Sequence, residues 1–117
     1  MPVENKISYN IHLVSDSTGE TLSTIAKAVL VQYKNLNFEQ HIHSLVRSKK
    51  QIESVYEDIK DKPGIILCTL YDIELKKTLQ SLCDELSIPL IDPLDTIHQS
   101  LTSVYGIKGT QIFKGKK

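Results

Sequence analysis

Hydrophobic and polar positions change their spacing several times along the chain, and each change predicts a strand followed by a helix. Apolar residues alternate with polar ones as far as Leu13 and Val14, which is typical of a strand with a buried end. From Leu22 to Tyr33 they recur at intervals of three and four, which is typical of one helix face. Further strands are predicted at residues 38–46, 65–70 and 88–91, each followed by a helix, and residues 65–70 are almost continuously apolar, which is typical of a central strand.

The predicted helix starts carry residues that can cap free backbone N–H groups. In chain order these caps are Ser17 with Glu20, Ser48 with Gln51, Asp72, and Asp92 followed by Pro93 at the first helical position. The first cap places the start of the first helix near Thr18. The Pro63-Gly64 pair ends the second helix, and Gly106 ends the fourth.

Four β-α repeats predict an α/β fold with an open parallel sheet of about four strands, Rossmann-like, with helices on both faces. The strand after residue 64 is the most apolar, and the strand after residue 37 is the most polar. A strand order of 2-1-3-4 follows, because it buries the first and third strands at the centre. In the second strand, Phe38, Ile42 and Val46 are expected on one face.

Ligands of such sheets bind where the connections reverse direction, outside the carboxyl ends of the central strands. Those ends carry a polar segment at residues 15–19, which we call the hinge, and the pair Tyr71-Asp72. The candidate nucleotide- or phosphate-binding residues are Ser15, Asp16, Ser17, Thr18, Gly19, Glu20, Thr21, Tyr71 and Asp72. The alternative is that the hinge residues only cap the helix and turn the chain.

The charges of the hinge restrict the ligand that it could accept. A helix start offers free N–H groups and a partial positive charge to an anion. The segment contains no Lys or Arg, however, and Asp16 and Glu20 would repel a dianion. A ribose, a phosphate bridged by a metal ion, or a ligand rich in hydroxyl groups would therefore fit better than a free phosphate.

Composition narrows the class of protein. The 117 residues suit one domain, and 14 Lys plus Arg balance 14 Asp plus Glu, so no global field favours nucleic acid or an anionic membrane. No apolar run is long enough to span a bilayer, and the start MPVENK lacks the apolar core of a signal peptide. We therefore expect a cytoplasmic protein in which Cys68 and Cys83 are buried thiols.

Other candidate sites have weaker support. His41 and His43 share a strand face, but no third metal ligand is evident and an edge strand needs polar residues, so we predict no metal site. The pairs Lys49-Lys50 and Lys76-Lys77 are interpreted as solvated. The phosphate-binding pattern G-x-x-x-x-G-K-[ST] cannot be drawn anywhere on the chain, and we assign no catalytic residues.

Two motifs resemble a known family. The run VSDSTGET at residues 14–21, followed by an amphipathic helix ending in Gln32-Tyr33, resembles the opening of the regulatory proteins of pyruvate, phosphate dikinase and phosphoenolpyruvate synthase. The segment PLIDPLDTI at residues 89–97 is similar to a strand-to-helix segment of that family. The resemblance implies that residues 1–106 form an amino-terminal α/β domain with a tail at residues 107–117, and that the family's carboxy-terminal P-loop-like half is absent from this chain.

The resemblance also implies an activity. Members of the family are bifunctional: they phosphorylate a Thr of the target enzyme with ADP, and they remove that phosphate with inorganic phosphate to give pyrophosphate. The resemblance implies a serine/threonine kinase with ADP or ATP and inorganic phosphate as substrates, and it leaves open whether Mg²⁺ is a cofactor. The implied protein partner is pyruvate, phosphate dikinase or phosphoenolpyruvate synthase. The chain alone is not expected to be catalytic. The alternative function is a non-enzymatic nucleotide-binding, dimerisation or docking module, and a homodimer is compatible with either.

Overall fold

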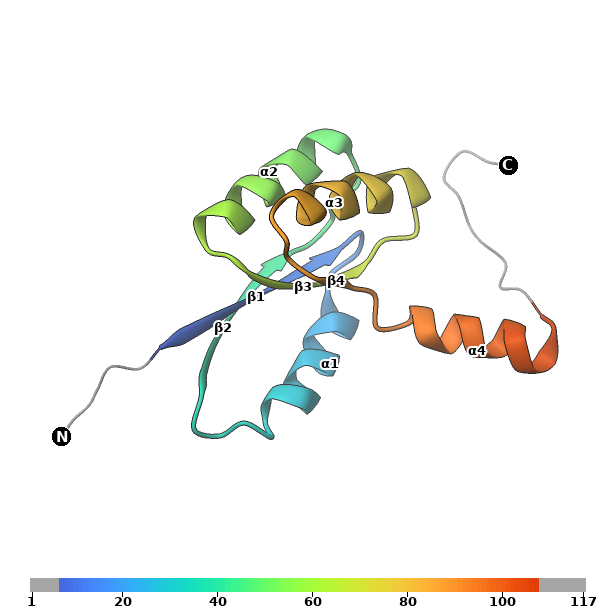
Figure 1. Cartoon of the computed structure of the whole chain (residues 1–117), viewed down its shortest axis with the longest axis horizontal. Coiled ribbons are helices and arrows are strands. Elements are labelled where there is room, and N and C mark those ends of the chain that lie inside the picture. Colours follow the sequence, from blue (N-terminus) through green and yellow to red (C-terminus); the bar gives the residue numbers. More distant parts are fainter. Residues whose placement is uncertain (1–6, 108–117) are drawn as a thin grey trace.

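The computed structural model describes residues 7–107, so nearly all of the tail predicted at residues 107–117 lies outside the described residues, as does the start MPVENK. Within this range strands and helices alternate (Figure 1). The elements are β1 (Ser8–Ser15), α1 (Glu20–Leu30), β2 (Asn37–His43), α2 (Lys49–Asp61), β3 (Gly64–Thr69), α3 (Ile73–Glu85), β4 (Leu90–Ile91) and α4 (Asp95–Tyr105).

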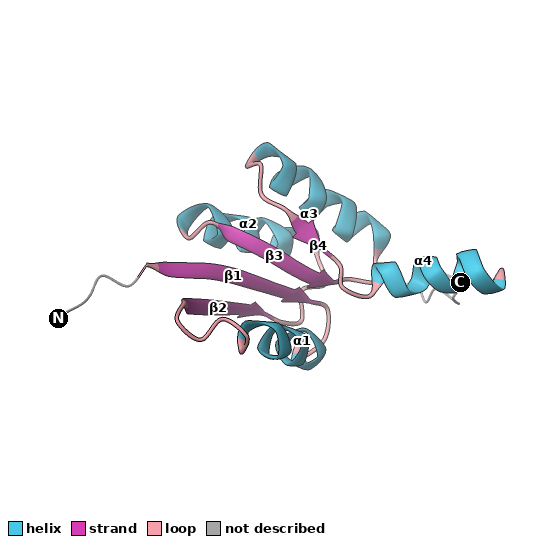
Figure 2. Ribbon diagram, turned by 60° about the horizontal axis from the view of Figure 1, so that its bottom comes forward, coloured by secondary structure: helices cyan, strands magenta, loops and turns pink. Residues whose placement is uncertain are grey.

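The described strands form one parallel sheet in the order β2-β1-β3-β4, which confirms the predicted topology. In the register, Leu13 of β1 lies between Ile42 of β2 and Leu67 of β3. Helix α1 covers one face of the sheet, and α2 and α3 cover the other (Figure 2). The connection after β1 therefore runs to one side and the connection after β2 to the other, as a doubly wound sheet requires.

The larger part of the core lies between the sheet and the helix pair α2 and α3. The buried residues of these helices recur at the three-and-four spacing that predicts one helix face. Their buried side chains join those of β1 and β3 in one cluster: Val14, Val46, Ile52, Val55, Ile59, Ile66, Cys68, Leu70, Leu75, Leu79 and Cys83. The prediction of buried thiols at Cys68 and Cys83 is confirmed.

A smaller cluster lies under α1. Ile11 and Leu13 of β1 pack there with Leu22 and Ala26 of α1. Tyr33, which the sequence pattern put on the same face, follows the end of α1 and has half of its surface exposed. Leu30, the last residue of α1, still packs against this cluster, so the chain leaves the sheet only after the helix ends.

The second strand ends earlier than predicted, and Val46 does not share the face of Phe38 and Ile42. Leu45 has a left-handed backbone (φ 56°), so the chain turns after His43. Val46 consequently enters the cluster beneath α2, whereas Phe38 packs against the cluster beneath α1. The period of two that links Phe38, Ile42 and Val46 does not continue through the turn.

The fourth helix also departs from the prediction. Strand β4 is short, and α4 begins at Asp95 with Leu94 at its N-cap position, so Pro93 is not the first helical residue. Asp92 instead accepts a hydrogen bond from the N–H of Leu94 at 3.0 Å. Gly106, with φ 67°, ends the helix as predicted.

Helix α4 projects away from the sheet and has no buried residue (Figures 1 and 2). Its apolar side chains remain exposed, including Ile97 at 58% and Val104 at 70%. Between residues 7 and 107, none of the helices combines the length and apolar character that crossing a bilayer requires.

Candidate functional site

The hinge connects the carboxyl end of central strand β1 to α1. Helix α1 begins at Glu20, and its N-cap is Gly19, whose φ of 87° and ψ of 6° are left-handed. No side chain caps this helix, so the predicted capping box of Ser17 and Glu20 is wrong. The helix starts two residues later than predicted, because the left-handed turn at Gly19 separates Ser17 from the first helical turn.

Ser15 organises the start of the hinge. Its side chain is buried, and its Oγ accepts a hydrogen bond from the N–H of Ser17 at 3.0 Å. The Ser17 hydroxyl lies 3.2 Å from the same Oγ, and the Thr69 hydroxyl lies 3.5 Å away. Ser17 therefore contacts Ser15 instead of α1, while Thr18 makes only a long contact from its Oγ1 to the N–H of Glu20, at 3.4 Å.

Asp16 connects the hinge to the loop that follows β3. Its Oδ2 accepts a hydrogen bond from the N–H of Tyr71 at 2.9 Å, and its own N–H lies 3.4 Å from the carbonyl oxygen of Thr69. The predicted proximity of the hinge and the Tyr71-Asp72 loop is confirmed. One carboxylate thus fixes the two loops at the carboxyl ends of β1 and β3.

A third segment borders the hinge. The N–H groups of Leu45 and Val46 donate to the carbonyl oxygens of Ser17 and Ser15, at 2.8 and 2.9 Å. The Nε of Arg47 donates to the carbonyl oxygen of Asp16 at 2.9 Å. Arg47 was not predicted from the sequence, although its place just after an edge strand beside β1 was a usable signal, because parallel strands end at the same edge of a sheet. The guanidinium group of Arg47 therefore places a positive charge beside the hinge.

The remaining candidate residues differ in how they are engaged. Asp72 caps α3 as predicted, since its Oδ1 accepts from the N–H groups of Glu74 and Leu75 at 2.9 and 3.3 Å. Tyr71 is 63% exposed, and Ser17, Thr18, Glu20 and Thr21 are also exposed. The hydroxyl groups of Ser17, Thr18 and Thr21 are thus exposed near the start of α1, whereas Asp72 caps α3.

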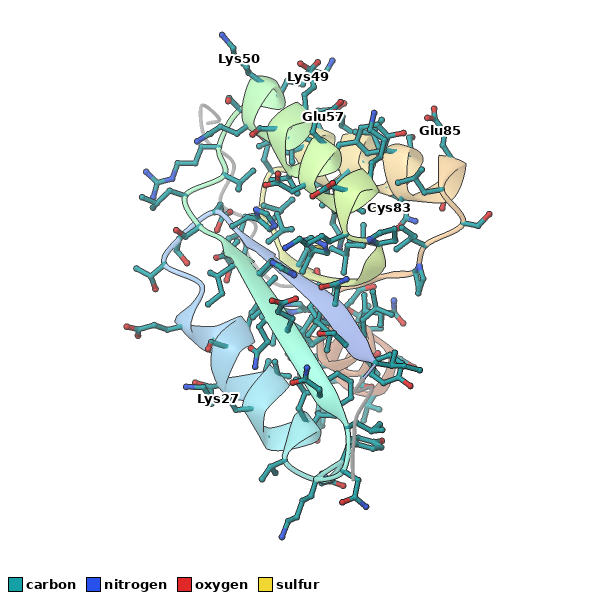
Figure 3. The ribbon with its side chains drawn as sticks, turned by 90° about the vertical axis from the view of Figure 1, so that its left-hand side faces the viewer. Lys27, Lys49, Lys50, Glu57, Cys83 and Glu85 are labelled. Carbon is teal, nitrogen blue, oxygen red and sulfur yellow. The ribbon has the colours of Figure 1, made fainter. Side chains whose placement is uncertain are left out.

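A salt bridge joins α3 to the residue that follows β4. The Nζ of Lys76 donates to Oδ2 of Asp92 at 2.8 Å, so the interpretation of Lys76 as solvated is wrong. Burial lowers the pKa of Lys76, but the hydrogen bond and charge of Asp92 raise it more, so the pKa lies above its ordinary value. Lys49 and Lys50 point away from the sheet at the start of α2 (Figure 3).

Other reactive side chains of the described range are held in structural roles. Burial raises the pKa of the Cys68 thiol to about 12 and that of Cys83 to about 11, so both are protonated near neutral pH. His41 and His43 share a sheet face with His12. Over residues 7–107, no cluster of three or more His, Cys, Asp or Glu side chains is arranged to hold a metal ion.

Comparison with known proteins gives a consistent result. The profile of the kinase/pyrophosphorylase family matches residues 11–116. A protein of Rhodopseudomonas palustris strain HaA2, named as a pyruvate, phosphate dikinase regulatory protein, is 41% identical over 102 residues, which cover 87% of this chain and 37% of that protein. The protein of that name from Bartonella tribocorum is 40% identical over 103 residues, or 88% of this chain and 38% of its own length.

A further relative with the same name, from Rhodopseudomonas palustris strain BisB18, is 39% identical over 110 residues. That match covers 94% of this chain and 39% of the relative. The chain therefore spans somewhat more than a third of the length of the curated relatives that it matches.

Proposed function

Because this chain belongs to the kinase/pyrophosphorylase family, we propose that it takes part in the reversible phosphorylation of pyruvate, phosphate dikinase. The names of its relatives support that target, and phosphoenolpyruvate synthase is the second candidate. The proposed reactions use ADP or ATP to phosphorylate a Thr of the target, and inorganic phosphate to remove the phosphate. Their proposed setting is the cytoplasm.

The part that we assign to residues 7–107 is nucleotide or phosphate binding at the hinge. The observation that carries this proposal is the hydrogen bond from the N–H of Tyr71 to Asp16, which joins the loops after β1 and β3 at 2.9 Å. These loops follow the two central strands, at the reversal of the connections where parallel sheets bind ligands. A cap alone would not require the two loops to be joined.

Electrostatics support an anionic ligand more strongly than the sequence suggested. The Asp16 carboxylate, which would repel a phosphate, is occupied on one oxygen by a backbone N–H group. Arg47 lies against the backbone of the same residue and brings a positive charge to the hinge. The start of α1, which is exposed at Glu20 and Thr21, adds its partial positive charge.

Phosphoryl transfer itself is not assigned to this chain. The pattern of a phosphate-cradling loop cannot be drawn on its 117 residues. We expect the isolated chain to leave a purified dikinase unphosphorylated in the presence of ADP and Mg²⁺, because catalysis of this reaction depends on positioned phosphate-binding groups. Turnover above a control without the protein would contradict this assignment.

Equilibrium binding of a fluorescent ADP analogue tests the proposed site. The variants Arg47→Ala and Lys49→Ala each remove one positive charge, but only Arg47 contacts the hinge, whereas Lys49 points away from the sheet (Figure 3). We expect weaker binding for Arg47→Ala and unchanged binding for Lys49→Ala. Absent binding to the unmodified chain, or equal losses for both variants, would contradict the proposal.

A homodimer is proposed as well, on a separate observation. Helix α4 exposes Ile97, Val104 and Tyr105 by 58%, 70% and 69%, and a second copy of the chain could cover this face. Because the formal net charge of the chain is zero, two copies would not repel each other through their overall charge. Light scattering after size exclusion should give a dimer that Val104→Asp converts to a monomer, whereas a concentration-independent monomer would contradict the proposal.

A further inference from the structure

Three histidines lie side by side on the sheet face beneath α2. His12 is at the middle of β1 with 1% of its surface exposed, and His41 is its register partner in β2. The His12 ring stacks on His41 with centroids 4.8 Å apart and on His43 with centroids 5.3 Å apart. A buried histidine between two others is an unusual choice for a sheet interior, where an apolar residue would be expected.

The hydrogen bonds of His12 fix the positions of its proton. Its Nε2 lies 2.8 Å from the carbonyl oxygen of Lys62, which can only accept, so Nε2 carries the proton. In the neutral ring Nδ1 must then accept, and it lies 3.0 Å from Nε2 of His43. His43 is therefore the donor of that bond, and its own Nδ1 is left 3.8 Å from Oδ2 of Asp58.

The result is a hydrogen-bond chain with one direction, which we call the histidine chain: His43 donates to His12, and His12 donates to the carbonyl group of Lys62. It joins β2, β1 and the end of α2. The titratable or charged groups that face its two rings are His41 from β2 and Asp58 from α2, while β3 places apolar Ile66 beside His12. His41 is itself bonded through Nε2 to Oδ1 of Asn10 at 2.9 Å.

A first proton can be accommodated on either ring. His43 can take one on Nδ1, where it faces the Asp58 carboxylate, and keep its bond to His12. If His12 takes one on Nδ1, neutral His43 must carry its own proton on Nδ1 and accept the bond from His12 on Nε2. Protonation of both rings places two N–H groups against each other at a hydrogen-bond distance and breaks the chain in a buried place.

We propose that the histidine chain is a proton-sensitive clasp that holds β2 and residues 44–47 on the sheet only while at least one of His12 and His43 is neutral. His43 is the last residue of β2, and the segment that follows it supplies the bonds from Leu45 and Val46 to the hinge. Acidification therefore loosens one wall of the hinge as well as the fold. The clasp stands apart from the ligand proposed for the hinge, and its test needs no ligand.

The sign of the effect follows from the environment of the rings. Burial lowers the pKa of His12, and the Lys62 hydrogen bond offsets this only in part. Burial and the neighbouring His12 also lower the pKa of His43. Since an unfolded histidine has a pKa of about 6.5, the unfolded chain binds more protons below that pH. Stability is complete above about pH 6.5, and each ring raises the unfolding constant by up to about tenfold per pH unit as the pH falls.

Urea unfolding between about pH 8 and pH 5 tests the clasp in the full chain. His12→Gln keeps a donor toward Lys62 but cannot be protonated, and His98→Gln on exposed α4 is the matched control. We expect the unfolding constant of the unmodified chain and of His98→Gln to rise steeply on acidification, and that of His12→Gln to rise up to about tenfold less per pH unit. Equal pH dependences for all three proteins would overturn the proposal.

Two measurements on the unmodified chain remain decisive if His12→Gln does not fold. Long-range ¹H–¹⁵N spectra should show the Nε2–H form for both His12 and His43 near neutral pH, and an Nδ1–H form of His12 would overturn the proposal. Hydrogen exchange should show that the protection factors of the Leu45 and Val46 amides fall at a higher pH than those of core strand β3. Simultaneous loss in both places would overturn the coupling to the hinge.

Discussion

Gly19 should tolerate other residues in an order set by its left-handed backbone. Its φ of 87° lies where a side chain brings Cβ close to the backbone, which costs about 1–2 kcal/mol for an ordinary residue. A Cβ at Gly19 would also lie 3.2 Å from Cγ2 of Ile42. Asn is tolerated in this region better than Ala, and a β-branched residue is tolerated worst. We therefore expect losses of about 1 kcal/mol for Gly19→Asn, about 2 for Gly19→Ala and about 3 for Gly19→Val.

Urea unfolding followed by circular dichroism measures these losses, and Ile42→Ala separates their two causes. Ile42 is 52% exposed, so its truncation should cost little by itself. In the Ile42→Ala background the steric part of the Gly19→Ala loss disappears and the strain of the backbone remains, so the second loss should be smaller but not zero. A Gly19→Val variant as stable as the unmodified chain, or a Gly19→Asn variant as unstable as Gly19→Val, would refute this reasoning.

Three further outcomes are expected. Ser48→Ala should lose about 1 kcal/mol in urea unfolding because Ser48 caps α2, whereas Ser17→Ala should stay within about 0.5 kcal/mol; equal losses would contradict the assigned caps. Gly64→Ala should lose about 3 kcal/mol in the same assay, because its Cβ would overlap the carbonyl oxygen of Asn10, and an unchanged midpoint would argue against the β1–β3 register. Cys68 should react with a thiol reagent only at the rate of unfolding, and fast labelling at neutral pH would contradict its burial.

Helix α2 shows where the sequence was sufficient. The Ser48 hydroxyl accepts from the N–H of Gln51 at 3.2 Å, and Pro63-Gly64 follows directly after the helix. The Gln51 side chain departs from the expected box, because it accepts from the N–H of Arg47 at 2.7 Å and donates to the carbonyl oxygen of Leu45 at 3.0 Å. Local cap, apolar spacing and terminator agree here with the packing against the sheet, so each signal strengthens the others.

Helix α1 shows why equally good spacing can fail. Ser17 and Glu20 have the capping-box separation, but the Ser17 N–H is bonded to Ser15 and the helix is entered through Gly19. A left-handed glycine is compatible with many sequences, so its presence could not be inferred from spacing. The same limit applies at Leu45, whose φ of 56° redirected Val46 into the other core cluster.

For the candidate site, the sheet topology could be predicted from the sequence, but the partners of individual side chains could not. The alternation of strands and helices, with the polarity of the second strand, was enough to bring the hinge to Tyr71. Arg47 and the Lys76–Asp92 pair were missed because their contacts join residues 31 and 16 positions apart and depend on side-chain conformation. His12 was missed for a different reason: it lies between Ile11 and Leu13 at a polar position of the alternating pattern, and that pattern does not indicate a buried side chain there.

The central claim is that the hinge binds a nucleotide, and calorimetric titration of ADP into the full chain tests it most directly. The matched variants are Gly19→Ala and Gly106→Ala, which both place a side chain at a left-handed glycine, but Gly106 ends α4 and has open space around it. We expect saturable heat with the unmodified chain and with Gly106→Ala, and weaker binding with Gly19→Ala, whose Cβ would press on Ile42 and shift the start of α1, at a temperature where all three are folded. No heat with the unmodified chain, or equal heats for the two variants, would contradict the claim.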